Sequence, residues 1–438
     1  MRIAVCFCLA SLAGTAIGDD WPQWMGPKRD NVWRESGIVE KFPVGGPKVV
    51  WRAKVSNGYG GPAVAGGRVF LGDFTSKSDV KTDNFGRQPH PGTERFLCLD
   101  QKTGSELWKH EYDVTYDISY PAGPRCTPVV DGERVYALGA MGNLFCFNAA
   151  DGKIVWSKDF QKDYKAEVAL WGYASHPLVD GKKLICVVGS PEGHAMAFDK
   201  ETGAELWRSK DTKDTGYSPP AIFNVGGTRQ LIIPRPDAVV SLDPETGKQH
   251  WSQPYKASNG SIIMTPVLAG KHLFVGGYSN QSLLLELDPA APAAKTVWKN
   301  KADGGLSPVN VQPMVEPAAD GKFTMYGFDQ NGTFCAVELP SGKRLWKGPQ
   351  PVAERPTYSA SAFMVKNEDR YFLFTELGDL VIGKLSPQNF KEIDRAKQVL
   401  APTNNAFGRS VVWCAPAFAD KRMYVRNDSE CIAVDLAK

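Results

Sequence analysis

The chain has 438 residues and a formal net charge of +3, from 51 basic and 48 acidic side chains. Hydrophobic residues make up 42% of the sequence and charged residues 23%, which is ordinary for a soluble protein and excludes a disordered chain or a polytopic membrane protein. Basic residues form no long run, so we expect no nucleic-acid partner. The 43 glycines, 31 prolines and 12 tryptophans predict many short strands joined by tight turns.

The N-terminal residues have the pattern of a secretory signal peptide. Arg2 supplies a positive charge, residues 3–12 are apolar, and small residues precede Asp19. We therefore predict a signal peptide at residues 1–18 and a soluble, exported protein, periplasmic or extracellular, with no transmembrane segment after signal removal. An uncleaved N-terminal anchor is the alternative.

Residues 19–46 contain aromatic residues without the alternation that is typical of a strand: Trp21, Trp24, Trp33 and Phe42. We predict that this range forms an N-terminal strap, which packs its aromatic side chains on the outside of the domain that follows. A role in docking a partner is the alternative for the strap.

A repeated turn-and-strand motif organises the rest of the chain. Five copies have an acidic residue or Asn, then Gly four positions later, then Trp four positions after that; LDQKTGSELW (99–108) and FDKETGAELW (198–207) are examples. The acidic residue or Asn caps a tight turn, and Gly takes the positive φ that the turn requires. The repeat therefore places a Trp at one position in a strand of each unit.

The sequence upstream of each motif predicts three further short strands, so each unit is a four-stranded antiparallel sheet. The C-terminal unit has only three strands, and residues 47–55 supply an isolated fourth strand with Trp51. We predict an all-β fold at residues 47–438: an eight-bladed β-propeller, closed by an N-terminal strand that completes the C-terminal blade. A linear solenoid would leave this last unit incomplete.

Residues 73–95 lengthen the first unit and are rich in polar residues. We predict a solvated, flexible loop over this range. Four acidic residues raise the alternative of a Ca²⁺ site, but they lack the spacing of a Ca²⁺-binding loop: Asp73, Asp79, Asp83 and Glu94.

Seven cysteines remain after the signal, and none lies next to another or in a CxxC motif. Those in apolar strands, such as Cys146 and Cys186, are predicted to be buried free thiols. An exported protein could still form one disulfide, which the sequence does not assign.

The repeat resembles the PQQ-like β-propeller family. That family includes the quinoprotein alcohol dehydrogenases and non-enzymatic propellers of the type of the outer-membrane assembly factor BamB, and the resemblance covers residues 47–438. It implies that the repeated Trp docks one blade against the next, which we expect of Trp51, Trp108, Trp156, Trp207, Trp251, Trp298 and Trp346.

The same resemblance implies that a quinoprotein dehydrogenase would have a vicinal disulfide over its cofactor, Ca²⁺ ligands and a catalytic Asp. After the signal this chain has no adjacent cysteines and no haem-binding CxxCH. It also lacks hydrolase, nucleotide-binding and metalloprotease motifs, and its six histidines have no metal-ligand spacing. We therefore predict no catalytic residue, no metal and no cofactor, and keep PQQ-dependent alcohol or sugar oxidation as the alternative function.

The loops that enter the innermost strands are long and varied, and in a propeller they open on one face together with the loops between the second and third strands. They carry residue types that are enriched at binding sites: Tyr59, Tyr120, Arg125, Trp171, Tyr173, Tyr217, Gln312, Tyr358, Arg409 and Trp413. We predict a monomeric scaffold that binds a protein or extended polymer partner on this loop-rich face. The alternative is that these residues only fill the channel. Among the histidines, His176 alone has a plausible channel position.

Overall fold

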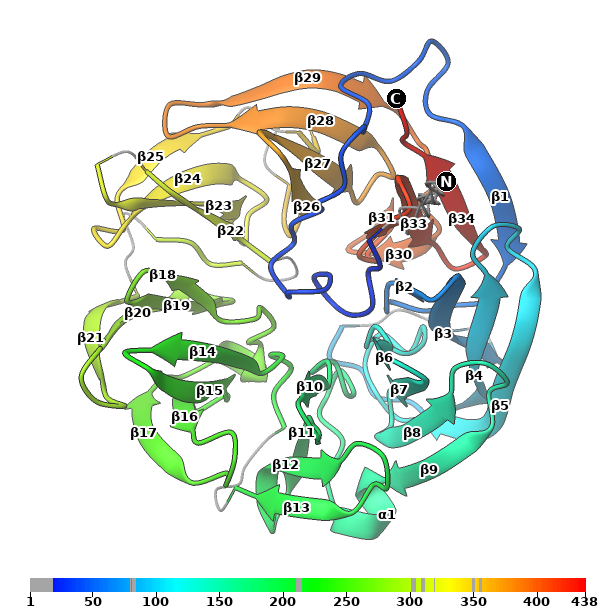
Figure 1. Cartoon of the computed structure of the whole chain (residues 1–438), viewed down its shortest axis with the longest axis horizontal. Coiled ribbons are helices and arrows are strands. Elements are labelled where there is room, and N and C mark those ends of the chain that lie inside the picture. Colours follow the sequence, from blue (N-terminus) through cyan, green and yellow to red (C-terminus); the bar gives the residue numbers. More distant parts are fainter. Residues whose placement is uncertain are drawn as a thin grey trace, which may run out of the picture.

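The computed structural model describes residues 19–78, 80, 84–209, 215–300, 305–308, 312–318, 320–348, 351–353 and 357–438. Within these ranges, eight four-stranded antiparallel sheets surround a central axis (Figure 1). This confirms the prediction of an eight-bladed, all-β propeller. The predicted signal peptide and the acidic residues Asp79 and Asp83 lie outside the described residues. None of the described helices is long and apolar enough to cross a membrane.

Seven blades are each built from four consecutive strands, with the first strand nearest the axis. The first four blades are β2 (Ala63–Ala65), β3 (Arg68–Ser76), β4 (His90–Asp100) and β5 (Glu106–Tyr116); β6 (Val129–Asp131), β7 (Arg134–Leu138), β8 (Asn143–Asn148) and β9 (Ile154–Asp159); β10 (Leu178–Asp180), β11 (Lys183–Ser190), β12 (Gly193–Asp199) and β13 (Glu205–Arg208); and β14 (Ala221–Val225), β15 (Thr228–Pro234), β16 (Ala238–Leu242) and β17 (Gln249–Pro254).

The next three blades are β18 (Val267–Ala269), β19 (His272–Gly277), β20 (Gln281–Leu287) and β21 (Ala294–Lys299); β22 (Met314–Pro317), β23 (Phe323–Phe328), β24 (Phe334–Leu339) and β25 (Arg344–Lys347); and β26 (Ala362–Asn367), β27 (Arg370–Thr375), β28 (Leu380–Leu385) and β29 (Phe390–Ala396). Loops between blades contain the hairpin of β30 (Asn404–Ala406) and β31 (Arg409–Val411), the short helix α1 (Phe160–Tyr164) and a 3-10 turn at Ser258–Gly260.

The eighth blade joins the two ends of the propeller, as predicted. It contains β32 (Ala417–Ala419), β33 (Arg422–Arg426) and β34 (Glu430–Asp435), and its outer strand is β1 (Val49–Lys54). The strands β1 and β34 are antiparallel, with Trp51 opposite Ala433. The ring is therefore held shut by backbone hydrogen bonds between distant parts of the chain.

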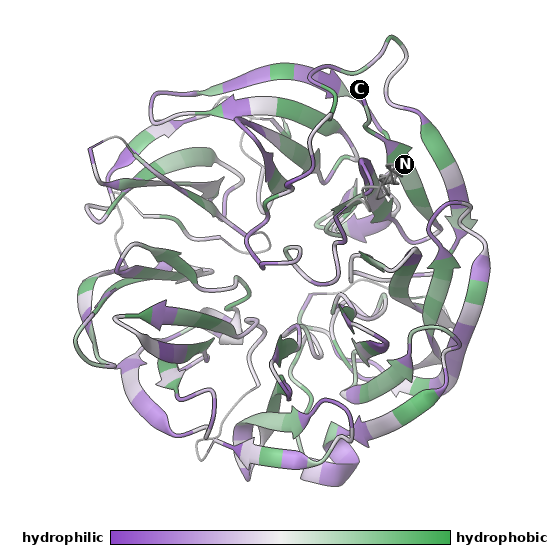
Figure 2. Ribbon diagram, in the orientation of Figure 1, coloured by the Kyte–Doolittle hydropathy of each residue, from purple (hydrophilic) through white to green (hydrophobic). Residues whose placement is uncertain are grey.

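The hydrophobic core lies between the blades. In β19, Leu273, Phe274 and Val275 are all fully buried, because each face of a blade packs against a neighbouring blade. The outer strands are more exposed; in β5, for example, exposed and half-buried residues alternate. Figure 2 shows the outer strands as mixed purple and green bands around greener inner strands. Separate apolar layers fill several blade interfaces, and one continuous layer joins the seventh, eighth and first blades.

The repeated Trp lies on the turn of the following blade. The indole N–H of Trp207 donates to the carbonyl of Pro244 (3.1 Å), and a Cβ added to Gly247 would lie 2.4 Å from the Trp207 ring. The same bond to a backbone carbonyl in the next blade is made by Trp51, Trp108, Trp156, Trp298 and Trp346. Trp251 differs: its indole donates to the Gln230 side chain of its own blade (2.7 Å). The motif that follows Trp251 is the one with a lengthened turn, at residues 287–298.

The first part of the strap lies across the central axis, so the prediction that its aromatic residues pack outside the ring was wrong for Trp21, Trp24 and Trp33. Phe42 instead lies near the rim, where its backbone N–H donates to Asp394 of the outer strand β29 (2.7 Å). Trp21 exchanges two backbone hydrogen bonds with Val64 of β2, and Trp33 donates its backbone N–H to Lys366 of β26. Trp24 donates from its indole to the Thr265 hydroxyl (3.0 Å) near β18. Figure 1 shows this dark blue segment in front of the innermost strands. The strap forms hydrogen bonds with backbone groups of the inner strands, and its own sequence does not show that these strands would be its packing surface.

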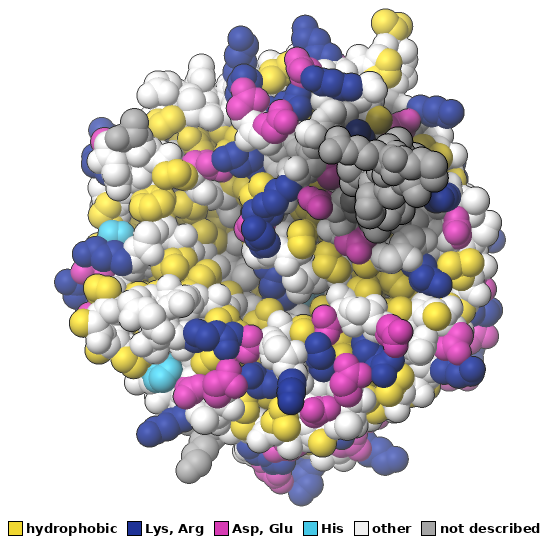
Figure 3. All heavy atoms as spheres, viewed as in Figure 1, with side chains coloured by type: hydrophobic (Ala, Val, Ile, Leu, Met, Phe, Trp, Pro, Cys, Tyr) yellow, Lys and Arg dark blue, Asp and Glu magenta, His cyan; other side chains and the backbone are white. Residues whose placement is uncertain are grey.

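Figure 3 shows the face of the ring that the strap crosses. Basic and acidic side chains are interspersed over the visible surface, and no broad field of one charge gathers there.

The polar insertion is mostly a long hairpin, because β3 extends to Ser76 and β4 begins at His90. Asp73 is fully buried and accepts two hydrogen bonds from Arg95 (2.8 and 2.6 Å) and one from the backbone of Ser56 (2.7 Å). Glu94 is also fully buried. The prediction of a solvated loop was therefore wrong for these two acids, since antiparallel pairing extends the sheet through them.

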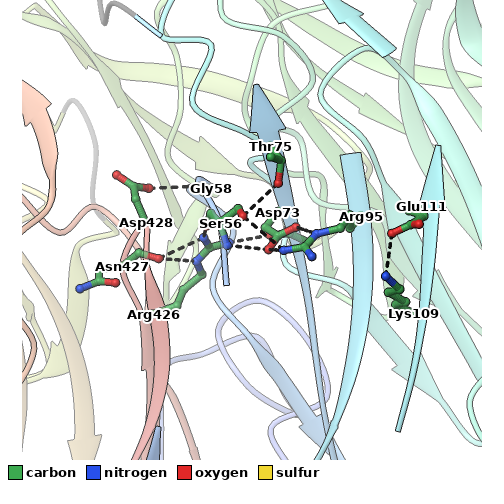
Figure 4. Close-up of polar contacts among 11 residues, drawn as sticks. Ser56, Gly58, Asp73, Thr75, Arg95, Lys109, Glu111, Arg426, Asn427 and Asp428 are labelled. Carbon is green, nitrogen blue, oxygen red and sulfur yellow. Dashed lines mark hydrogen bonds and ion pairs between the residues drawn. The ribbon is translucent and has the colours of Figure 1, made fainter. Parts of the chain in front are cut away.

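A buried arginine joins the last blade to the first at this hairpin. Arg426 of β33 is fully buried, and its guanidinium donates to the carbonyls of Gly72 (2.6 Å), Ser56 and Asn427 (3.1 Å for Nε). Figure 4 shows Arg426 and Arg95 meeting around Ser56. These bonds add a polar cross-link to the seam that β1 closes.

Candidate functional site

A cavity of about 540 Å³ lies on the central axis. Its walls come from the loops between blades and between second and third strands, which is the face that the sequence singled out. Trp24 of the strap lines the cavity and also a small void beside Trp21 and Asn31, so Trp24 marks its strap-side end. The described lining residues are Trp24, Tyr59, Gly61, Asn84, Phe85, Tyr120, Arg125, Thr127, Trp171, Ala174, His176, Tyr217, Pro219, Asn259, Ser261, Ile263, Met264, Tyr278, Gln312, Tyr358, Ser359, Phe363, Phe407, Trp413 and Ala415.

Eight of the ten residues predicted from the loops line this cavity: Tyr59, Tyr120, Arg125, Trp171, Tyr217, Gln312, Tyr358 and Trp413. Tyr173 does not, because it is buried in the interface between the second and third blades and donates to the carbonyl of Val188 (2.9 Å). Arg409 is absent from the described lining and forms an ion pair with buried Glu376 (2.8 Å).

Sequence reasoning missed several of the aromatic residues in the lining. Phe85 and Phe407 lie within the loops that were singled out, but Tyr and Trp were favoured there over Phe. Tyr278 lies in the loop between β19 and β20, whereas the predicted residues all come from loops that enter an innermost strand. Trp24 could not be found, because the strap was placed outside the ring.

Aromatic side chains form two connected groups around the cavity. In one group, the Tyr358 ring meets Phe407 edge-on with centroids 5.1 Å apart, and Phe407 lies 6.0 Å from Trp413. In the other, Trp171 lies between Phe85 (5.7 Å) and Tyr217 (5.3 Å). Phe85, Tyr358 and Phe407 are 54%, 44% and 45% exposed. Large apolar rings are therefore offered to solvent at a concave site, which is where ligands and partners bind.

Arg125 is the one Lys or Arg among the described lining residues. Its guanidinium lies over the Tyr59 ring, 5.1 Å from the centroid, and donates to the carbonyls of Gly123 (2.6 Å) and Ser119 (2.9 Å). Burial lowers the pKa of Arg125 from its usual value, although the group stays charged at neutral pH. No described carboxylate lies within ion-pair distance of it.

His176 lies beside Trp24 at the strap-side end of the cavity. The two rings are stacked with centroids 4.6 Å apart, and the Nδ1 atom of His176 accepts the backbone N–H of Thr127 (2.9 Å). Burial, reinforced by the nearby charge of Arg29, lowers the pKa of His176 to about 3. The imidazole is therefore neutral, and since Nδ1 accepts a hydrogen bond, Nε2 carries the proton.

Among the described residues, no cluster of His, Cys, Asp or Glu side chains is arranged to hold a metal ion. All seven described cysteines are free and buried. Asp and Glu are likewise absent from the described part of the cavity lining. The cavity thus offers aromatic rings, amides, hydroxyls, one imidazole and one guanidinium.

Comparison with known proteins gives related sequences of two kinds. The family profile described as outer membrane protein assembly factor BamB matches residues 92–348. The BamB of Alteromonas naphthalenivorans is 27% identical over 289 residues, which cover 61% of this chain and 64% of that protein. A polyvinylalcohol dehydrogenase of a Pseudomonas species is 26% identical over 332 residues, covering 58% of this chain and 51% of the relative. The chain thus spans less than two thirds of the length of these two curated relatives.

Among solved structures, the quinohemoprotein alcohol dehydrogenase of Comamonas testosteroni superposes with a TM-score of 0.61. It is 14% identical, and the match covers 95% of this chain and 80% of that one. At this identity the likeness concerns the fold alone.

Proposed function

This chain belongs to the family of the outer membrane protein assembly factor BamB, and from that premise we propose that it is an exported, non-catalytic β-propeller scaffold. It binds a protein or extended polymer partner on its loop-rich face. The observation that carries this proposal is the aromatic cavity on the propeller axis, with three large rings exposed at its walls.

The exposed rings supply the binding energy. Aromatic and Arg side chains dominate the energy of most interfaces when they become buried in complementary pockets. Tyr358 packs edge-on against Phe407, and Phe407 in turn contacts Trp413, so these rings support one another before a partner binds. Trp171 is similarly held, because its indole donates to Asn84 (3.3 Å) and its backbone N–H donates to the Tyr217 hydroxyl (3.3 Å). Such preorganisation favours tight binding.

The chemistry of the described lining supports a binding role over catalysis. General acid–base catalysis near neutral pH needs a group whose pKa lies near the working pH. His176 does not meet this requirement, because its pKa is lowered to about 3 and its ring is held by Trp24 and the Thr127 backbone. Arg125 is permanently charged at neutral pH.

The alternative function, PQQ-dependent oxidation of an alcohol or a sugar, is favoured by the dehydrogenases among the relatives and structural neighbours. The described cavity residues do not fit a metal-bound PQQ. Its metal would need carboxylate and amide oxygens, but the described lining provides no carboxylate. A vicinal disulfide is also excluded, because the described cysteines are free and none is adjacent to another.

Site-specific photo-crosslinking tests the scaffold proposal. A photoreactive phenylalanine replaces Tyr358 in the cavity wall or, as a matched control, Leu107 on the outer strand β5, which is 48% exposed. In the native host, we expect crosslinked products from position 358 and none from position 107. Products from position 107 alone, or from neither position, would contradict a partner on the loop-rich face.

Cofactor loading tests the alternative function. The purified protein is incubated with PQQ and Ca²⁺ and supplied with alcohols or aldoses and an artificial electron acceptor. We expect no PQQ-dependent dye reduction. Turnover that requires PQQ would overturn the non-catalytic proposal.

A further inference from the structure

We propose that the cavity binds an anionic saccharide: a sugar ring that carries a carboxylate or a sulfate, at the end or on a branch of a polymer chain. This inference rests on the proposed function, since it names the chemistry of the partner at the same site. Three features carry it: unpaired cationic charge, aromatic walls interrupted by uncharged polar groups, and a cavity that is closed on the strap side.

The first feature is the guanidinium of Arg125. Three of its five N–H bonds point to the carbonyls of Gly123, Ser119 and Tyr120. The Nε–H and one Nη1–H have no partner among the described residues. No described carboxylate forms an ion pair with the guanidinium, and Glu94 interacts with its charge only at longer range. An Arg that is fixed by backbone carbonyls but keeps two donors on different edges can give a single charge-assisted hydrogen bond to a carboxylate or a sulfate.

A second unpaired cation lies behind the strap-side end of the cavity. The guanidinium of Arg29 donates to the carbonyls of Pro177 (3.1 Å) and Pro220 (3.3 Å), while its buried Nε has no described partner. No described acid forms an ion pair with it, and its charge helps to keep His176 neutral. Buried charges are normally paired, so two unpaired guanidinium groups around one cavity give it a positive potential that an anionic ligand would compensate.

Two described acids near the cavity, Glu376 and Glu94, do not cancel this potential. Glu376 is engaged by Arg409 (2.8 and 3.2 Å) and by the indole of Trp413 (2.9 Å). Glu94 accepts hydrogen bonds from the hydroxyls of Tyr112 and Tyr116, and burial raises its pKa to about 7. One acid is therefore already neutralised by its own cation, and the other is partly protonated at neutral pH.

The walls match a sugar ring. A pyranose has an apolar C–H face and a rim of hydroxyl groups, so it needs a flat apolar surface beside hydrogen-bonding groups. Trp171 and Tyr217 supply two apolar rings on one wall, inclined at 59° to each other, and Asn259 and Ser261 supply an amide and a hydroxyl in the same lining. His176 adds a donor, because its protonated Nε2 has no described partner. Uncharged polar groups among aromatic rings bind hydroxyls without the desolvation cost of a charged group.

The shape limits how a polymer can enter. Trp24 marks the strap-side end of the cavity, and its indole is anchored to Thr265 (3.0 Å). A chain therefore cannot thread through the ring, and only an end or a branch can enter from the loop-rich face. The volume of about 540 Å³ lies within the ~300–1,000 Å³ of ordinary small-ligand sites.

Calorimetric titration with short saccharides tests the inference. The probes are trigalacturonate, its fully methyl-esterified neutral form, and a sulfated chondroitin disaccharide. We expect the carboxylated or the sulfated probe to bind, and the neutral trisaccharide to bind at least about tenfold more weakly because it lacks the charge-assisted hydrogen bonds. The chondroitin disaccharide carries a uronate carboxylate beside its sulfate, so tighter binding of this probe than of trigalacturonate would show that the site uses the sulfate.

Two variants locate the charge. Arg125→Gln should weaken binding of the anionic probe by about tenfold or more, because it removes the unpaired cation. Arg52→Gln is the matched control: it removes the same charge from the outer strand β1, where Arg52 pairs with Glu430, and should leave the affinity within about twofold. Equal losses in the two variants, or no loss with Arg125→Gln, would overturn the inference.

Other ligands give distinct outcomes. Equal binding of the neutral and charged trisaccharides, or Arg125-dependent binding of PQQ or an acidic peptide with no saccharide bound, would overturn the anionic-saccharide assignment. If no saccharide binds but position 358 still crosslinks to a protein, this inference fails and the scaffold proposal stands. If both experiments fail, the scaffold proposal fails as well.

Discussion

Truncating the Trp that docks one blade on the next should destabilise the ring by a calculable amount. Trp207 is 8% exposed, its ring covers Gly247 of the following blade, and its indole donates to the carbonyl of Pro244. Trp207→Ala removes the ring and leaves that carbonyl without its donor. We therefore expect a large fall in the free energy of unfolding.

The magnitude follows from the buried area. An aromatic side chain of this size buries roughly 150–250 Å², which at ~25 cal/mol per Å² corresponds to ~4–6 kcal/mol. The unfolded chain already hides part of this area, which lowers the loss, whereas the unmade hydrogen bond adds about 1 kcal/mol. We expect Trp207→Ala to cost ~3–5 kcal/mol, in the range of other large aromatic truncations. Trp207→Phe keeps a ring but loses the donor, and should cost less.

Urea denaturation followed by circular dichroism measures the effect, with unfolding rates as a second readout. Leu206→Ala is the matched control, because Leu206 is the adjacent residue on β13 and is 48% exposed; it should change stability by less than about 0.5 kcal/mol. A loss below about 1 kcal/mol for Trp207→Ala, or an equal loss for Leu206→Ala, would refute the docking argument.

Three further predictions concern a turn and two buried titratable groups. Gly247→Ala should lower the free energy of unfolding clearly more than Gly132→Ala in the same denaturation assay. Both residues have positive φ (71° and 58°), but only at Gly247 would the new Cβ meet the Trp207 ring. Equal losses of stability would contradict a steric role for Gly247. Burial raises the pKa of Glu94 from 4.5 to about 7, so between these pH values the unfolded chain has released a proton that the folded chain keeps. The free energy of unfolding therefore falls as pH rises. Glu94→Gln should remove this decline between about pH 5 and about pH 8. The pKa of His176 is lowered from 6.5 to about 3, so its contribution to stability is lost as pH falls through this window; His176→Gln should reduce the acid-side loss, and an unchanged pH profile of denaturation midpoints would contradict the assignment.

Much of the candidate site could be predicted because the repeat reveals which loops meet. The turn motif shows which strand of each blade is innermost, so the loops before the innermost strands had to converge on one face. Four of the predicted residues do line one cavity there: Tyr59, Trp171, Tyr358 and Trp413. Tyr173 differs because its ring turns into the neighbouring blade interface, where its hydroxyl finds the carbonyl of Val188. The position of a loop follows from the order of the strands. The direction of a side chain in that loop depends on how it packs against neighbouring residues, and the order of the strands does not determine this packing.

The sequence by itself determined the ring. The spacing of acidic residue, Gly and Trp sets a turn and a strand in each unit, and the three-stranded C-terminal unit requires a strand from elsewhere, which β1 provides. The turn and the strand of each unit are local features, since each depends on a residue's own φ, its own capping bond or its place in an alternating strand. The pairing of β1 with β34 is not local, but it follows from counting these strands.

Only the tertiary structure decided what lies on the axis. The strap has no alternation to show which side it packs on, and its partners Val64, Thr265 and Lys366 come from three different blades. The charge of Arg125 likewise becomes visible only when the surrounding loops are in place and no described carboxylate of these loops forms an ion pair with it. Contacts among residues hundreds of positions apart arise when the ring closes, because closure alone brings their loops and inner strands around one axis.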